Sequence, residues 1–205
     1  MFNEKQLSDR KENTMAFDIN IMKNEFDLFF EKYKNCDFEG ENDEADYVKD
    51  ADRLLGEFGD KAESEEEKEA LSKKLALMGG KLMMLTDNPN APKYYHKAID
   101  LQPNSYDIRW DYYTTLEEIV ENEEYATKEL IDDAIECLRF CIDYCDTEEL
   151  RAEKCVQNRY YDLARVYMAA KDYANVVVWT EKYLDNEWDE DVQELLDTAL
   201  EYLEE

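Results

Sequence analysis

The stretch GGKLMMLTDNPNAPKYYHKAIDLQPN, residues 79–104, places small, aromatic and helix-ending residues at regular intervals. It opens on a glycine pair, and Ala91, Tyr95 and Pro103 follow Gly79 in that order. Small residues allow two helices to approach closely, an aromatic ring fills the space beside them, and a proline stops a helix. The stretch therefore predicts a closely packed helix pair with its crossing at Gly79 and Ala91.

The rest of the chain also shows helical periodicity. The sequence holds only 5 Gly and 3 Pro, and its apolar residues recur at intervals of three and four. An alternation typical of strands does not persist, so we predict an all-α fold. Residues 17–33 and 44–58 are expected to form two helices joined by an acidic loop, and residues 191–203 a final helix.

The order of residue types over residues 72–105 resembles the tetratricopeptide repeat (TPR), a two-helix unit of about 34 residues. The family pattern has a large residue, Leu-Gly and Tyr on the first helix, then Ala, an aromatic residue, Ala and Pro. A second match begins at Tyr160, and its Ala164 and Val176 are 12 residues apart, as are Gly79 and Ala91. An irregular unit with extra residues lies between the two matches.

This resemblance implies three irregular repeats in residues 72–205, stacked as a TPR-like solenoid of helical hairpins with a C-terminal capping helix. Before them we expect a flexible tail at residues 1–14 and an acidic helical hairpin at residues 15–71, which is a degenerate repeat or a cap. Members of the family hold protein segments in a concave groove. The resemblance thus implies a non-enzymatic protein–protein interaction module that acts as an adaptor, a chaperone or an inhibitor.

The register of the resemblance also gives candidate residues for the groove. Methionines adapt to varied apolar partners and cations suit a carboxylate, so an extended or helical protein segment would fit such a surface. Ala76 and Gly80 also face the groove in this register, where chaperone-binding members carry clamp side chains, which argues against a clamp of that kind. The candidate groove residues are Lys73, Met83, Met84, Asn158, Tyr161, Arg165 and Met168.

The chain is strongly acidic, with 53 Asp and Glu against 24 Lys and Arg and a formal net charge of -29. This charge repels phosphates and anionic membranes, so we expect no direct binding to nucleic acid or to a membrane. Charge is also unevenly placed: residues 183–205 hold 10 acidic and no basic side chains, whereas residues 151–171 hold 5 basic and 2 acidic ones. A basic partner on the acidic surface and an acidic peptide in the groove both remain open, as does self-association.

An alternative hypothesis makes the acidity itself the function. Carboxylates at helical spacing imitate phosphates and can occupy the basic channel of a nucleic-acid-binding protein, as a phage-type anti-defence inhibitor would. The candidate residues for this acidic surface are Glu117, Glu118, Glu121, Glu123, Glu124, Asp132 and Asp133.

The sequence provides little for catalysis or metal binding. Its single histidine, His96, lies between a predicted packing tyrosine and alanine, and the segment DNEWDEDVQELL lacks the glycine and the final carboxylate of a calcium loop. Cys137, Cys141 and Cys145 fall every fourth residue, which strings them along one helix. We therefore expect no enzyme activity, no cofactor and no metal, with the three thiols forming a small apolar stripe against a neighbouring helix.

The cellular compartment is expected to be the cytoplasm. The segment MFNEKQLSDRKENT at the N-terminus lacks the apolar stretch of a secretory signal, and the longest apolar run is too short to span a bilayer. Cysteines that remain reduced fit the same compartment.

Overall fold

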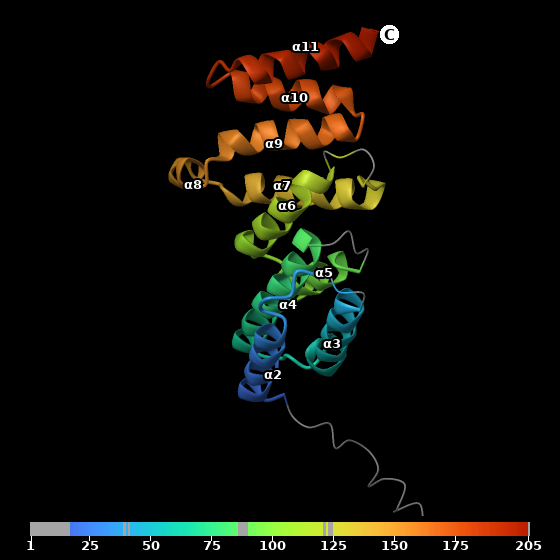
Figure 1. Ribbon diagram of the computed structural model, residues 1–205. Coiled ribbons are helices and arrows are strands. Elements are labelled where there is room, and N and C mark those ends of the chain that lie inside the picture. The colour runs from blue at the N-terminus through green and yellow to red at the C-terminus, as the bar shows by residue number, and fades with distance from the viewer. Residues whose placement is uncertain are drawn as a thin grey trace, which may run out of the picture. The chain divides into compact units, whose positions relative to one another are not determined.

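The computed structural model describes residues 17–38, 40, 42–85, 90–120, 122 and 125–204, and the predicted tail at residues 1–14 lies outside them. Within the described residues every regular element is an α-helix, which confirms the all-α prediction (Figure 1). The chain divides into two compact units, residues 1–74 and 75–205, here called unit 1 and unit 2. Helix α4 (Glu65–Leu85) runs unbroken through residues 71 and 72, where the sequence pattern predicted a domain boundary.

Unit 1 contains α2 (Ile19–Lys32), α3 (Asp43–Phe58) and the first part of α4. The Asp18 side chain caps α2 by accepting hydrogen bonds from the backbone N–H groups of Asn20 and Ile21, which have no partner within the helix. Aromatic side chains from α2 and α3 make its core, and the ring centroids of Phe29 and Tyr47 are 4.8 Å apart.

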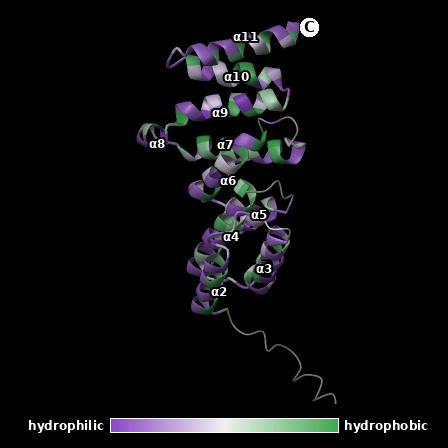
Figure 2. Cartoon of the chain, in the orientation of Figure 1, coloured by the Kyte–Doolittle hydropathy of each residue, from purple (hydrophilic) through white to green (hydrophobic). Residues whose placement is uncertain are grey.

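Unit 2 contains the second part of α4 and seven further described helices, and hydrophobic and hydrophilic residues are mixed along these helices (Figure 2). Sequential neighbours pack against each other: α5 on α6, α6 on α7, α9 on α10 and α10 on α11, with α7 also against α9. The bounds of these helices are α5 (Pro92–Leu101), α6 (Tyr106–Val120), α7 (Lys128–Tyr144), α8 (Glu148–Glu153), α9 (Val156–Ala169), α10 (Tyr173–Leu184) and α11 (Glu190–Glu204).

The close approach predicted at Gly79 and Ala91 is confirmed. A Cβ atom added to Gly79 would lie 2.9 Å from Cδ2 of Tyr95 and 3.3 Å from the carbonyl oxygen of Ala91. A Cβ atom added to Gly80 would lie 2.7 Å from the Tyr95 hydroxyl. Tyr95 is fully buried and stacks on Tyr112 of α6 with 4.4 Å between ring centroids, so the two glycines make room for a ring that joins α4, α5 and α6.

A polar network lies beside this aromatic stack and joins α5, α6 and α7. The Tyr112 hydroxyl donates a 2.6 Å hydrogen bond to Oδ2 of Asp133, and Nε2 of His96 lies 2.7 Å from the same oxygen. The Tyr95 hydroxyl donates separately to Asp111 over 2.9 Å. Burial, and then the hydrogen bond to Asp133, raise the pKa of Tyr112, so its hydroxyl stays protonated and remains a donor.

We expect this network to make unit 2 more stable at mildly acidic than at alkaline pH. The hydrogen bond to Asp133 is the largest cause of the raised pKa of His96. Burial opposes it, and the charges of Asp133, Glu129 and Asp100 add smaller effects in the raising direction. Stabilisation by protonated His96 is complete below the ordinary histidine pKa and is lost as pH rises through the raised one. NMR can follow the imidazole of this single histidine directly. A titration midpoint that does not fall in Asp133→Asn would contradict the assignment.

The two cysteines of α7, and Cys145 directly after its end, are packed as the sequence predicted. Cys137, Cys141 and Cys145 are buried and make no disulfide. Burial raises the pKa of the Cys141 thiol to about 12, and the pKa of Cys137 is raised for the same reason. These thiols are therefore uncharged packing groups.

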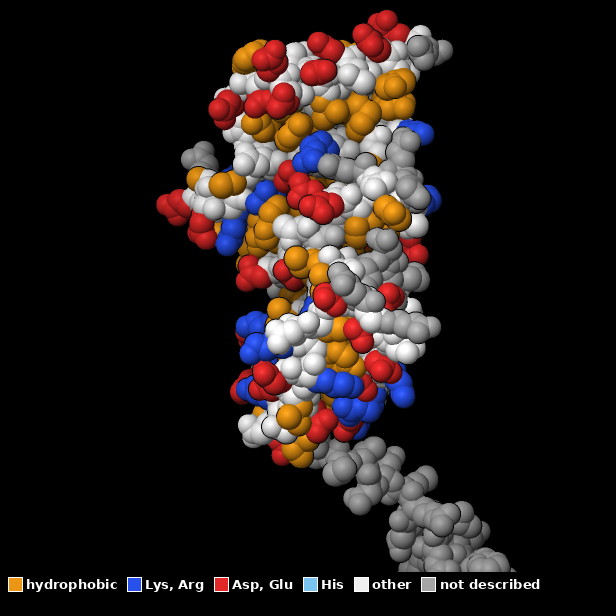
Figure 3. Space-filling view, in the orientation of Figure 1, with side chains coloured by type: hydrophobic (Ala, Val, Ile, Leu, Met, Phe, Trp, Pro, Cys, Tyr) orange, Lys and Arg blue, Asp and Glu red, His pale blue; other side chains and the backbone are white. Residues whose placement is uncertain are grey.

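Helix α11 has a buried side and an acidic side. Val192 and Ala199 are buried, and the carboxylates on the opposite side of the helix are exposed. Figure 3 shows Asp and Glu side chains gathered along this helix. The exposed row comprises Glu190, Glu194, Asp197, Glu201 and Glu204.

Candidate functional site

A pocket of about 510 Å³ lies in unit 2 where α6 and α9 end, beside the start of α7 and the middle of α11. Val120 and Ile131 are buried apolar residues in its lining, and Met168 and Leu195 are partly exposed apolar ones. A pocket of this size and character suits a large apolar side chain with its flanking backbone. The lining residues are Val120, Ala126, Ile131, Arg165, Met168, Ala169, Lys171 and Leu195.

Arg165 is the first of two cations in this lining. One of its guanidinium nitrogens donates a 3.1 Å hydrogen bond to Oε1 of Glu117 on α6, and the guanidinium lies 5.6 Å from the ring centroid of Tyr161. These two contacts, from a neighbouring helix and from the preceding turn of α9, fix where the guanidinium points. The arginine is therefore a positioned charge at the pocket.

Lys171 is the second cation and has an unusual backbone conformation. Its φ is 58°, in the left-handed region that favours glycine. The residue ends α9 with two backbone hydrogen bonds of 3.0 Å each, from its own N–H to the carbonyl of Met168 and from Asp172 N–H to that of Tyr167. This pattern is common where a helix ends, but glycine usually occupies the left-handed position. A lysine there is strained and exposes its charge.

We expect Lys171→Gly to stabilise unit 2 by up to about 1 kcal/mol, because glycine adopts a left-handed backbone without strain. The matched control is Ala170→Gly. Ala170 precedes Lys171 and has an ordinary right-handed φ of -71°, so glycine there costs about 0.5–1 kcal/mol. Denaturant unfolding followed by tryptophan fluorescence measures both, since Trp110, Trp179 and Trp188 all belong to unit 2. A loss of stability in Lys171→Gly would show that the backbone is not strained.

The structure brings three of the predicted groove residues together. Tyr161, Arg165 and Met168 lie along one side of α9 and are partly exposed. Asn158 is exposed at the start of the same helix and lines a different pocket, of about 400 Å³, with Tyr160 and Asn186 among its neighbours.

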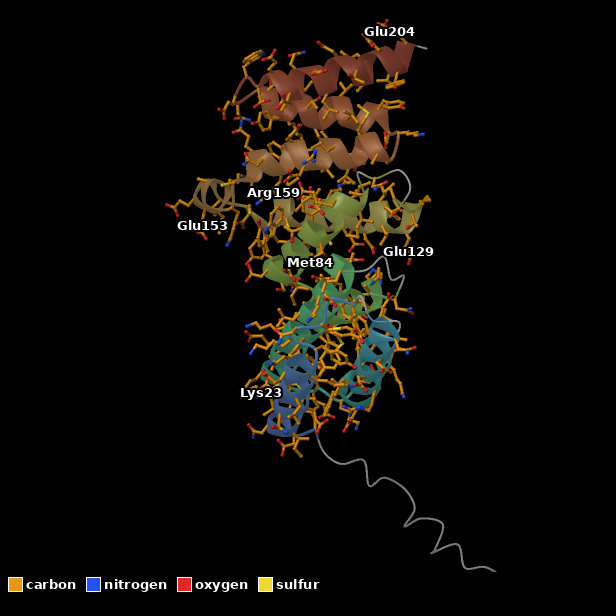
Figure 4. All side chains as sticks on the ribbon, in the orientation of Figure 1. Lys23, Met84, Glu129, Glu153, Arg159 and Glu204 are labelled. Carbon is orange, nitrogen blue, oxygen red and sulfur yellow. The ribbon has the colours of Figure 1, made fainter. Side chains whose placement is uncertain are left out.

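The remaining groove residues, from α4, do not form one surface. Met84, labelled in Figure 4, is 76% exposed, but Met83 is 7% exposed and accepts a contact from the Thr115 hydroxyl of α6. The prediction for Met83 is therefore wrong, because α6 covers that side of α4. Ala76 and Gly80 are also buried, and the hydroxyl of Tyr95 occupies the space beside Gly80. Lys73 belongs to unit 1 and pairs with Glu69 over 2.6 Å.

The predicted acidic surface is not a continuous row of free carboxylates. Glu117 pairs with Arg165, and Asp133 accepts hydrogen bonds inside the polar network described above. Asp132 is exposed but pairs with Lys128 over 2.6 Å, whereas Glu118 is exposed on α6. The other three predicted residues, Glu121, Glu123 and Glu124, lie outside the described residues.

Several lining residues were not predicted from the sequence. Val120, Ile131 and Leu195 come from three different helices, so their convergence is a product of tertiary packing. Lys171 could have been found, because it follows the helix end in the segment AAKDYANVV at a position where glycine is common.

The described residues provide packing and hydrogen-bonding groups at the pocket and no cluster of metal ligands. Among them, no group of His, Cys, Asp and Glu could hold a metal ion, and no helix has the length and apolar character needed to cross a membrane. The comparisons with known proteins found no matching family model, no matching curated protein and no matching solved structure.

Proposed function

We propose that this protein is a non-enzymatic protein–protein interaction module of TPR-like helical hairpins, and that it binds a partner protein at the pocket on α6, α9 and α11. The observation that carries the proposal is the lining of this pocket, which offers apolar surface and two cations. Such a lining suits recognition of a side chain, and its described residues include no histidine, cysteine or carboxylate. An adaptor, chaperone or inhibitor role would use it in the same way.

The packing of unit 2 supports the TPR-like part of the proposal. Helices α6 and α7, and then α9 and α10, pack as sequential pairs, and α7 contacts α9 to join the pairs. Small residues at the α4–α5 crossing and an aromatic ring beside them follow the family pattern. A stack of repeats requires a capping helix whose outer face is polar, and α11 has one buried side and one acidic side. The reduced, buried cysteines fit a cytoplasmic location.

The test of this function is recovery of a partner from native lysate by the tagged protein at low and at high salt, with mass spectrometry as readout. Binding through a mainly apolar pocket should survive high salt. Replacing Tyr161 and Arg165 with alanine should weaken recovery about tenfold, because anchors of this kind carry most of the binding energy. The matched control is the Arg139→Ala, Tyr144→Ala pair on α7, which replaces the same residue types at exposed positions. Equal losses in both pairs would refute the site.

A second candidate function is the acidic mimic of nucleic acid, which the exposed carboxylate row of α11 favours. Along a helix these side chains are about 5–6 Å apart, and no lysine or arginine occurs among residues 183–205. This function predicts a basic, nucleic-acid-binding partner that salt releases and that DNA or RNA displaces. Reversing the charges of Glu194, Asp197 and Glu201 should then weaken binding, while the Tyr161 and Arg165 changes should have no effect.

A further inference from the structure

We infer that the pocket on α6, α9 and α11 selects a partner segment that carries a large apolar side chain next to a carboxylate. This inference rests on the proposed function and specifies the chemistry of the partner. It assigns a binding role to Lys171, at the edge where the apolar lining meets water.

The apolar part of the inference follows from the lining. Six of the eight described lining residues are apolar, and they come from α6, α9, α11, the start of α7 and, for Ala126, the segment just before α7. Burial of a large apolar side chain against them removes apolar surface from water on both partners. Met168 contributes an unbranched side chain that can adjust to the shape of the anchor.

The acidic part of the inference follows from charge complementarity. Both charged residues of the described lining, Arg165 and Lys171, are cations, although the whole chain has a net charge of -29. Glu117 holds the Arg165 guanidinium in place, while Lys171 is exposed and makes no side-chain hydrogen bond or ion pair with the part of the chain that the structure describes. A carboxylate on the partner would meet Lys171 there, whereas a basic segment would meet like charge.

The backbone of Lys171 provides an independent reason to assign it a role. The left-handed position would be filled without strain by glycine, and a strained residue at a binding surface indicates a functional constraint. Glycine would remove the ammonium, so lysine at this position keeps a positive charge at the edge of the pocket. Lys171→Gly is accordingly expected to raise the melting temperature of unit 2 while weakening binding.

The experiment selects a displayed library of short random peptides on the full-length protein. The most enriched peptide is then synthesised in two forms, the second with its Asp and Glu replaced by Asn and Gln. Fluorescence anisotropy measures the affinity of each form for the wild type, Lys171→Glu and Arg139→Glu. Arg139 is exposed on α7 outside the pocket lining, so its reversal is a control with the same change in net charge.

We expect enriched peptides to contain a large apolar residue within a few positions of Asp or Glu. Lys171→Glu should weaken the acidic form about tenfold and Arg139→Glu no more than about twofold, because only the first reversal places a negative charge beside the partner carboxylate. The amide form should bind the wild type more weakly than the acidic form does, and Lys171→Glu should hardly change its affinity. The two peptides and two proteins thus form a double-mutant cycle that measures the coupling between Lys171 and the peptide carboxylate.

Two other outcomes would separate the failure of this inference from that of the proposed function. Enriched basic peptides, or acidic ones that bind Lys171→Glu as well as wild type, would overturn the partner chemistry and leave a peptide-binding protein. A selection that enriches no peptide would overturn the proposed function together with the inference.

Discussion

Replacing Tyr95 with alanine is expected to lower the free energy of unfolding of unit 2 by about 4 kcal/mol, because it removes a fully buried aromatic ring. The ring stacks on Tyr112 and its hydroxyl donates to Asp111, so the substitution leaves a cavity and removes contacts between α5 and α6. Tyr125→Ala, at an exposed position, should change stability by less than about 0.5 kcal/mol. Denaturant unfolding followed by tryptophan fluorescence measures both.

The Tyr95 ring also leads us to expect that the effect of Gly79→Ala depends on the residue at position 95. Gly79→Ala in the wild type places a Cβ atom 2.9 Å from Tyr95, so the ring must shift and we expect a loss of about 1–2 kcal/mol. In the Tyr95→Ala background the clash with the ring is gone and only the 3.3 Å approach to the Ala91 carbonyl remains, so Gly79→Ala should cost much less or become neutral, because alanine favours helix over glycine. Additive effects of the two substitutions would show that the glycine is not there to accommodate the ring.

This crossing also shows how far the sequence predicts the fold. Gly79, Ala91 and Tyr95 lie within 17 consecutive residues, so their spacing, aligned with the two-helix pattern of a TPR, predicts which helices meet and where. The burial of Met83 depends instead on α6, which contributes Thr115 and begins more than 20 residues later. Helical periodicity predicts that such residues share a side of α4, but the neighbour that covers that side is set by tertiary packing.

The candidate site also has one part that the sequence predicts and one part that depends on tertiary packing. Tyr161, Arg165 and Met168 share one side of α9 because they follow the helical repeat, and that repeat is visible in the sequence. The pocket beside them also needs Val120, Ile131 and Leu195, which span 76 residues and have no common pattern. Glu117 and Asp133 look alike in a list of acidic residues, but one fixes Arg165 and the other completes a polar network. Only the packed helices distinguish these roles from that of a solvated carboxylate.

Asp132 and Asp133 provide the sharpest test of that distinction, because they are adjacent carboxylates on α7 with different surroundings. Asp133→Ala should lower the free energy of unfolding of unit 2 by about 3 kcal/mol. The substitution removes the carboxylate that accepts the hydrogen bond of the Tyr112 hydroxyl and that pairs with His96, and the Tyr112 side chain is only 1% exposed. Asp132→Ala removes only an exposed ion pair with Lys128 and should cost no more than about 0.5 kcal/mol.

The two variants should also differ in their response to pH. Asp133→Ala removes the main cause of the raised pKa of His96, so the excess stability of the wild type at mildly acidic over alkaline pH should shrink. Asp132→Ala should retain it. Unfolding curves recorded for both variants across neutral pH would decide the matter, and equal losses in the two would mean that Asp133 acts only as one more negative charge on the surface. A large, pH-dependent loss confined to Asp133→Ala would instead identify it as the residue through which α5, α6 and α7 are held together.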